Sequence, residues 1–258
     1  MLTLYFSGTG NTKYLAELFS RKMNAACFSI EDESNIKIAA HDTIAFCYPV
    51  YCSRVPRIMR EFVHRNMGAL RGKKLIIFAT QMKFSGDGAR VFCDMFEPGT
   101  IEVIYAEHFN MQQNMGNTPF FNLWAPSEKS AQKYLHKTEA KLNRVCADIK
   151  NGVVKLRGFA FGSQMLGMIQ GIFWQRDTKS PAAERAEKKM QSGIKIHKEC
   201  NACGICVKIC PMKNLSADHG QIKHLNNCTV CYRCVNLCPQ KAITVFLHAK
   251  PRWQYYLQ

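Results

Sequence analysis

The chain has 258 residues, 47% of them hydrophobic, with 13 cysteines and a net charge of +16 at neutral pH. That length leaves room for two domains, each with a hydrophobic core. No basic segment precedes the first apolar residues, which predicts no secretory signal and a cytoplasmic location where thiols stay reduced. No nucleic-acid-binding motif accompanies the positive charge, so we expect no nucleic-acid partner and instead protein partners with acidic surfaces.

The N-terminal segment predicts an anion-binding site. Residues 2–6 have the pattern of a buried strand, and Tyr14, Leu15, Leu18 and Phe19 follow at helical spacing. A short loop of glycines, hydroxyls and one amide separates them: Ser7, Gly8, Thr9, Gly10, Asn11 and Thr12. The N–H groups of such a loop and the dipole of the following helix favour a phosphate. The loop matches neither the Walker A pattern nor the dinucleotide fingerprint G-x-G-x-x-G.

Two further predicted strands also end in loops. The strand at 43–47 leads into Tyr48, Pro49, Val50, Tyr51 and Cys52. The strand at 75–80 leads into a third loop, for which the candidate binding residues are Thr80, Gln81, Lys83, Phe84, Ser85, Gly86 and Asp87. Because open α/β sheets bind ligands outside the carboxyl ends of their strands, we expect the three loops to form one site.

The three loops resemble those of the flavodoxin family, over about residues 1–107. The resemblance implies an α/β fold with a doubly wound parallel sheet, and an FMN whose phosphate lies in the first loop and whose ring lies beside the other two. Typical members flank the flavin with two aromatic side chains, whereas the third loop here offers only Phe84. Tyr51, Cys52 and Asp87 are candidate catalytic residues, although Asp87 is also explained as the N-cap of a helix over 88–96.

The middle of the chain predicts a fifth strand at 100–105 and a long helix over 127–151 that covers one side of the sheet. The polar loop 111–119 between them is either a plain connection or a lid over a ligand. Residues 158–174 are apolar and spaced by glycines, but too short and too polar for a membrane span. We expect them to pack between two domains, with an interfacial helix on a membrane as the alternative. The charged, alanine-rich residues 177–193 predict a helical or mobile connector.

Eight cysteines near the C-terminus follow one pattern, C-x₂-C-x₂-C-x₃-C-P, which occurs twice at an offset of 28 residues. The first run is Cys200, Cys203, Cys206 and Cys210, and the second is Cys228, Cys231, Cys234 and Cys238. A zinc site would use two cysteine pairs with a longer spacer between them, and a single C-x-x-C would be compatible with a redox disulfide. The repeated run of four cysteines therefore favours neither a zinc site nor a redox disulfide.

The two runs resemble the two-cluster bacterial ferredoxins, over about residues 194–248. The resemblance implies two [4Fe–4S] clusters and one-electron transfer at low potential. In that family the fourth cysteine of each run ligates the other cluster. Cluster I is thereby assigned to Cys200, Cys203, Cys206 and Cys238, and cluster II to Cys228, Cys231, Cys234 and Cys210.

The whole chain thus resembles the fused flavodoxin–ferredoxin proteins that are common in anaerobes. We expect a flavodoxin-like domain at 1–152, a linker or interdomain segment at 153–193 and a ferredoxin domain at 194–258. The resemblance implies an electron carrier that couples one-electron and two-electron steps. A flavin-dependent reductase of a small molecule bound over the FMN, supplied with electrons through the clusters, is the alternative. The sequence also lacks, after the first loop, the glycine fingerprint that a separate pyridine-nucleotide domain would carry.

Overall fold

The computed structural model describes residues 1–51, 53–117, 125–173, 181–245 and 248–257. These residues form two compact units, each of which is described by itself. The first unit comprises Met1–Ser7, Asn11–Gln112 and Lys129–Arg176. The second comprises Gly8–Gly10, Gln113–Glu128 and Asp177–Gln258.

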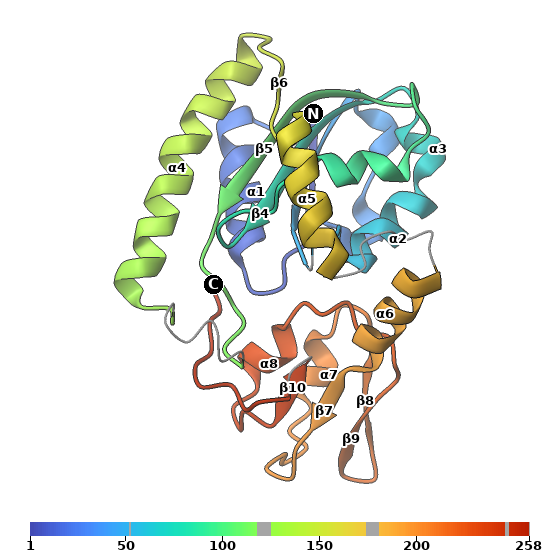
Figure 1. The fold of residues 1–258 in the computed structure, drawn as a ribbon, viewed down its shortest axis with the longest axis vertical. Helices are drawn as coiled ribbons and strands as arrows, with labels where there is room; N and C mark the ends of the chain where they lie inside the picture. Colours follow the sequence, from blue (N-terminus) through green and yellow to red (C-terminus); the bar gives the residue numbers. More distant parts are fainter. Residues whose placement is uncertain (52, 118–124, 174–180, 246–247, 258) are drawn as a thin grey trace. The chain divides into compact units, whose positions relative to one another are not determined.

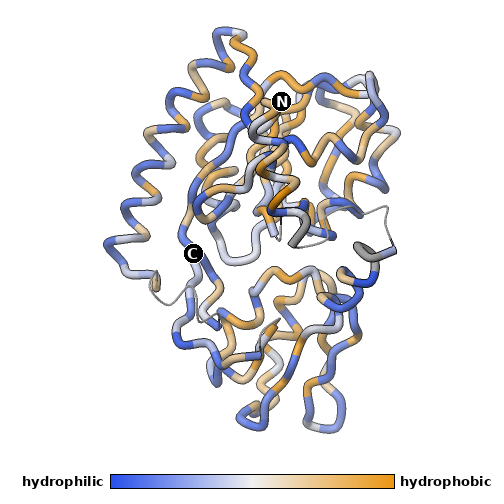
Figure 2. The backbone as a smooth tube through the Cα atoms, viewed as in Figure 1, coloured by the Kyte–Doolittle hydropathy of each residue, from blue (hydrophilic) through white to orange (hydrophobic). Residues whose placement is uncertain are grey.

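The first unit is built on a six-stranded sheet with the order β2-β1-β3-β4-β5-β6, in which every neighbouring pair is parallel (Figure 1). Its strands are β1 Leu2–Tyr5, β2 Ala26–Ser29, β3 Thr43–Pro49, β4 Lys74–Gln81, β5 Glu102–Asn110 and β6 Lys155–Leu156. The sheet confirms the predicted doubly wound α/β fold. The hydrophobic colour of Figure 2 is concentrated on its central strands, as expected for parallel strands that are covered on both faces.

Helices cover both faces of this sheet (Figure 1). On one face, α1 Asn11–Met23 and α4 Glu128–Lys150 share a hydrophobic core with the strands, through residues such as Phe19, Phe78 and Leu142. On the other face lie α2 Arg57–Arg65, α3 Met67–Leu70 and the 3₁₀ helix η3 Arg90–Met95, whose Phe92 packs on Phe46. Two short 3₁₀ helices, η1 Ile30–Asn35 and η2 Ile38–Ala40, connect β2 to β3. The predicted long helix over 127–151 is confirmed.

The sheet differs from the sequence prediction at its far edge. β5 extends to Asn110, five residues beyond the predicted end of the fifth strand. β6 follows it as a sixth strand of two residues, paired to β5 through Lys155 opposite Tyr105. A strand this short has no periodicity that a sequence pattern could reveal. The predicted helix over 88–96 is instead the 3₁₀ helix η3, which begins two residues later.

The glycine-spaced stretch forms α5 Phe161–Phe173, which belongs to the first unit. Its small residues pack closely on the third loop: a Cβ at Gly86 would lie 2.5 Å from the backbone nitrogen of Gly167. Gly86 also has a φ of +63°, so this position favours glycine twice over. The expectation that the stretch packs between two domains stays a prediction.

The second unit contains a structural repeat with the same 28-residue offset as the cysteines. Its two short helices are α7 Ile205–Ile209 and α8 Arg233–Leu237. Left-handed backbone conformations recur at matching positions, in the pairs Ala202 and Val230, Gly204 and Tyr232, and Lys213 and Lys241. The remaining elements are α6 Pro181–Ser192, the antiparallel pair β7 Ile194–Ile196 and β10 Ile243–Val245, and the hairpin β8 Leu215–Asp218 and β9 Gln221–His224.

The loop after β5 contributes residues to the second unit. Met115 packs against the core of that unit, and the Asn117 side chain donates a hydrogen bond to the Val245 carbonyl at 2.8 Å. These contacts hold the described part of the loop against the core of the second unit, and the two interpretations of the loop, as a plain connection or as a lid, stay predictions. Its last two predicted residues, 118 and 119, lie outside the described residues. The helical interpretation of the connector 177–193 is confirmed over Pro181–Ser192 by α6, whereas residues 177–180 lie outside the described residues.

Candidate functional site

The three predicted binding loops follow the carboxyl ends of β1, β3 and β4, which are neighbours in the sheet. Hydrogen bonds join them: the hydroxyls of Thr12 and Thr80 lie 2.7 Å apart, and the Val50 N–H donates to the Thr80 carbonyl at 2.9 Å. A Cβ at Gly88 would lie 2.9 Å from the Val50 side chain, so the second and third loops also meet directly. The structure thus brings the three loops together at one edge of the sheet.

The first loop has the features that an anion site requires. Ser7, Thr9 and Thr12 are buried, and α1 begins at Asn11 with no acidic residue in its first turn. The N-terminus of this 13-residue helix therefore carries an uncompensated positive dipole end at the loop. Gly10 has a φ of +95°, a conformation that a residue with a side chain adopts only under strain.

Two side chains of the first loop already have partners. The Asn11 amide donates to the Gln112 carbonyl at 2.6 Å, which ties the start of α1 to the residues after β5. The Thr9 hydroxyl lies 3.1 Å from the side-chain nitrogen of Asn114, so it accepts a hydrogen bond and keeps its own proton for a ligand. Asn114 was not among the predicted binding residues, because its distance from Thr9 in sequence gives no local signal.

The second loop is a tight turn in which Tyr51 and Arg54 exchange two backbone hydrogen bonds, of 3.1 and 2.9 Å. Ser53, inside the turn, has a positive φ of +57°. Tyr51, Pro49 and Val50 are half-buried, whereas Arg54 is buried, which adds a cation to this loop that the sequence prediction did not include. Cys52 lies outside the described residues, so nothing follows for its candidate catalytic role.

The third loop contains one exposed aromatic residue, and hydrogen bonds among its polar residues hold the backbone around it. Phe84 is 55% exposed, and the neighbouring Lys83 is exposed as well. The Ser85 hydroxyl donates to the Gln81 side chain, and the Gln81 amide donates to the Lys83 carbonyl at 3.1 Å. Phe84 is therefore exposed to solvent, while hydrogen bonds of the Gln81 and Ser85 side chains hold the loop that carries it.

Asp87 is not the helix cap that one interpretation of the sequence predicted, and its candidate catalytic role stays a prediction. It is fully buried, and its carboxylate accepts hydrogen bonds from the Arg90 guanidinium at 3.0 and 2.9 Å. The cap position of η3 belongs to Ala89, so the N-cap interpretation of Asp87 is wrong. The sequence separation of three residues brings Arg90 onto the same side of this turn, and the ion pair commits the carboxylate to holding the third loop.

His108 on β5 supports the third loop from the sheet. Its Nε2 accepts the Ala89 N–H at 3.0 Å, which requires a neutral ring. Burial lowers the pKa of His108 to about 4, and the positive charge of Arg157 contributes in the same direction. Glu107 and Asp87 oppose this shift, and Lys141 adds to it.

We expect this neutral histidine to make the fold sensitive to acid. In the unfolded chain His108 has the ordinary pKa of about 6.5. As the pH falls from 6.5 towards 4, the unfolded chain therefore binds a proton at this ring and the folded chain does not. The free energy of unfolding should therefore decrease across that window, by roughly 3 kcal/mol at most. His108→Gln keeps an acceptor but does not titrate, so its loss of stability between pH 7 and pH 5 should be smaller.

The measurement is the midpoint of denaturant unfolding at both pH values, followed by near-ultraviolet circular dichroism. His219→Gln is the matched control, because the His219 side chain is 95% exposed. Equal pH dependence in the wild type and in His108→Gln would show that protonation of this ring does not limit stability.

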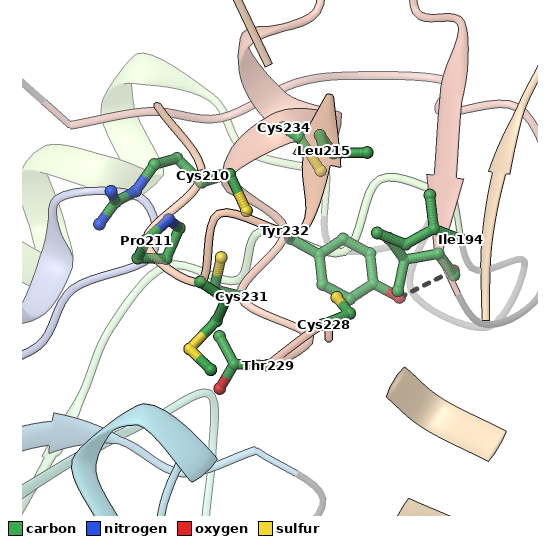
Figure 3. Close-up of a pocket in the computed structure, with 12 residues that line it drawn as sticks. Ile194, Cys210, Pro211, Leu215, Cys228, Thr229, Cys231, Tyr232 and Cys234 are labelled. Atoms are coloured by element: carbon green, nitrogen blue, oxygen red, sulfur yellow. Dashed lines mark hydrogen bonds between the residues drawn. The ribbon is translucent and has the colours of Figure 1, made fainter. Parts of the chain in front are cut away.

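The eight cysteines line two separate hollows in the second unit. Figure 3 shows the first, which is lined by Cys210, Cys228, Cys231 and Cys234 and contains about 330 Å³ of empty space, including solvent at its opening. The second, of about 280 Å³, is lined by Cys200, Cys203, Cys206 and Cys238. Each hollow thus takes three cysteines from one run and the fourth from the other run. The remaining lining is largely apolar, with Tyr232 beside the first hollow and Ile222 beside the second.

Backbone N–H groups point at cysteine sulfurs in a repeated arrangement. The Sγ atoms of Cys200 and Cys228 accept from the N–H two residues ahead, at 3.4 and 3.2 Å. The Sγ atoms of Cys210 and Cys238 accept from the N–H four residues ahead, at 3.2 and 3.3 Å. Such bonds stabilise thiolate sulfur and tune the potential of a bound iron–sulfur cluster. The donor set and its hydrogen bonds therefore fit a thiolate-ligated cluster in each hollow.

Comparison with known proteins matches a different family to each end of the chain. The family model of the flavodoxin domain matches residues 2–121, and the family model of the 4Fe–4S dicluster domain matches residues 185–243. The chain joins a flavodoxin domain to a 4Fe–4S dicluster domain. A flavodoxin domain implies FMN, and a dicluster domain implies 4Fe–4S centres, so the protein has an electron-transfer redox role.

Solved structures similar to this chain include several flavodoxins. The two-electron reduced flavodoxin of Megasphaera elsdenii has 21% identity and a TM-score of 0.38, with 55% of this chain and 99% of that chain covered. Oxidised flavodoxin 2 from Bacillus cereus has 15% identity and a TM-score of 0.39, with coverage of 57% and 97%. The search of curated proteins found no match. Among the described residues, no helix is long and apolar enough to cross a bilayer.

Proposed function

We propose that the protein is an electron carrier in which two [4Fe–4S] clusters in the dicluster domain exchange electrons with FMN in the flavodoxin domain. The observation that carries the proposal is the grouping of eight cysteines into two hollows of four, in a chain that also brings three flavodoxin-type loops together. Clusters held by thiolates transfer one electron at a time, and FMN accepts one or two. Joining both on one chain replaces a bimolecular encounter by an internal step.

For the clusters, we propose the crossed ligand assignment. Cluster I would be held by Cys200, Cys203, Cys206 and Cys238, and cluster II by Cys228, Cys231, Cys234 and Cys210. The lining of the two hollows supports it, because each hollow contains the fourth cysteine of the opposite run. Thiolate ligands require a reducing compartment, which supports a cytoplasmic location, and clusters of this type favour an anaerobic cell.

For FMN, we propose that the first loop holds the phosphate through its N–H groups and the hydroxyls of Ser7, Thr9 and Thr12. The backbone near Val50 and Tyr51 and the third loop around Phe84 would border the ring. Lys83 and the buried Arg54 place positive charge in these two loops. Positive charge beside a flavin stabilises its anionic reduced form, so these residues would raise its reduction potential.

The test is internal electron transfer in the anaerobically purified protein. Mixing with a reduced low-potential ferredoxin should reduce FMN after the clusters, with no oxidation of NADPH in a parallel assay. Cys200→Ser combined with Cys228→Ser should slow flavin reduction by the ferredoxin at least tenfold. Photochemical reduction of FMN in the same variant should be unchanged, since it needs no cluster.

Two results would contradict the carrier function. Flavin reduction by the ferredoxin at the wild-type rate in the cluster variant would show that electrons do not pass through the clusters. Steady turnover of a small molecule over the reduced FMN would favour the reductase instead. Acidic partner proteins should be recognisable by an association rate that falls steeply as salt is added.

A further inference from the structure

Helix α5 exposes a continuous apolar face. Phe161, Met165, Met168 and Ile169 are 79%, 47%, 53% and 47% exposed. Their spacing of four, seven and eight residues from Phe161 places them along one side of the helix. Leu166, 40% exposed, widens this stripe. Patches of this kind on a folded chain mark sites of interaction with a protein or a membrane.

The opposite side of α5 fixes which face points outward. Besides the backbone of Gly167, the Ser163 carbonyl lies 2.9 Å from the position of a Cβ at Gly86. Both are on the small-residue side of the helix, so that side is held against the third loop by close backbone contact. Rotation of α5 to bury its apolar face would replace these contacts with large side chains, for which the loop has no room.

Along the chain, cations outnumber acidic residues beside α5, where Asp148 and Asp177 flank the segment 149–176. Residues 149–176 contain four cations, Lys150, Lys155, Arg157 and Arg176, and no acidic residue. The side chains of Lys155 and Arg157, on and just after the edge strand β6, are 51% and 57% exposed. Their acidic partner is Glu107, which is buried and is shared with Lys141. One carboxylate cannot balance three cations, so the region beside the helix remains positive.

We propose that α5 lies in the headgroup layer of an anionic lipid bilayer and docks the flavodoxin domain on that surface. Thirteen residues at about 1.5 Å each give roughly 20 Å, which is too short for the roughly 30 Å apolar core of a bilayer. An apolar face bordered by Lys and Arg is the pattern of a helix that lies in the interface plane. The inference is independent of the proposed electron transfer.

An acidic protein partner would explain the cations near α5 but not the exposed apolar face of that helix. The exposed stripe contains only apolar side chains, and the polar residues Ser163, Gln164 and Gln170 of α5 are all half-buried. A protein surface matched to that stripe would be apolar, whereas the surrounding cations would then remain without partners. An anionic bilayer explains both features, because acyl chains bury the apolar side chains and lipid phosphates pair with the cations.

The test is sedimentation of the holoprotein with vesicles of phosphatidylcholine, with and without 30% phosphatidylglycerol. We expect at least tenfold tighter binding to the anionic vesicles at low salt, and a loss of that preference in high salt. Met165→Gln combined with Ile169→Gln should weaken binding at least tenfold. Lys155→Gln combined with Arg157→Gln should reduce the anionic preference about fivefold for each charge.

Leu225→Gln is the matched control, since Leu225 is an exposed apolar residue of the second unit at 58% exposure. It should bind vesicles like the wild type, and all variants should keep their FMN and iron, which shows that they fold. Absence of vesicle binding, or equal binding to both vesicle types, would overturn the proposal. So would a concentration-dependent dimer that is lost in the Met165 and Ile169 variant, because the face would then belong to a second copy of the chain.

Discussion

Cys210→Ser combined with Cys228→Ser is expected to leave about four irons per chain, whereas Cys200→Ser combined with Cys210→Ser is expected to leave almost none. In the crossed assignment the first pair belongs to one cluster, so the other cluster keeps all four ligands. The second pair takes one ligand from each cluster. If each run of four held its own cluster, the two double variants would give the opposite results.

The measurement is iron and acid-labile sulfide on anaerobically purified protein, with the electron paramagnetic resonance of the reduced samples as a second readout. Cys146→Ser is the matched control, because Cys146 is a buried free cysteine in the core of the first unit. It should keep about eight irons. Retained FMN in every variant separates the loss of a cluster from the loss of the fold. Equal iron in the two double variants would reject the crossed assignment.

The parts of this protein that the sequence predicts well are those set by local patterns. The 28-residue repeat of cysteines predicts a structural repeat, and its backbone follows it down to single left-handed residues such as Ala202 and Val230. Gly204 and Tyr232 occupy matching left-handed positions, although only the glycine adopts that conformation without strain. The Tyr232 side chain is buried and its hydroxyl donates to the Val245 carbonyl at 3.3 Å, which holds the strained residue in place.

The parts that the sequence does not predict depend on partners far apart in the chain. The N-cap prediction for Asp87 was wrong because the N-cap pattern is local, whereas the turn that follows depends on Arg90 and on His108 from β5. The hydrogen bond between Asn114 and Thr9 joins residues more than a hundred positions apart. β6 is held by pairing to β5, and its two residues carry no signal of their own. In each case the information lies in tertiary contacts.

Removing two hydroxyls from the first loop is expected to release FMN and leave the clusters in place. In Ser7→Ala combined with Thr9→Ala, the phosphate would lose two donors to a charged group, each worth about 1.5–3 kcal/mol. The dissociation constant of FMN should therefore rise by about two orders of magnitude or more. The Asn114 amide would also lose its acceptor on Thr9.

Flavin fluorescence during dialysis measures the release, and cluster absorbance near 400 nm in the same sample reports on the second unit. Ser192→Ala is the matched control, because Ser192 is an exposed hydroxyl at the end of α6 that bonds to the Lys188 and Lys189 carbonyls of its own helix. Wild-type FMN affinity in the double variant would remove the first loop as the phosphate site. Loss of the clusters together with FMN would show instead that the two hydroxyls are needed for the fold. Release of FMN alone would separate the two cofactor sites, because it would show that the clusters of the second unit do not depend on the flavin.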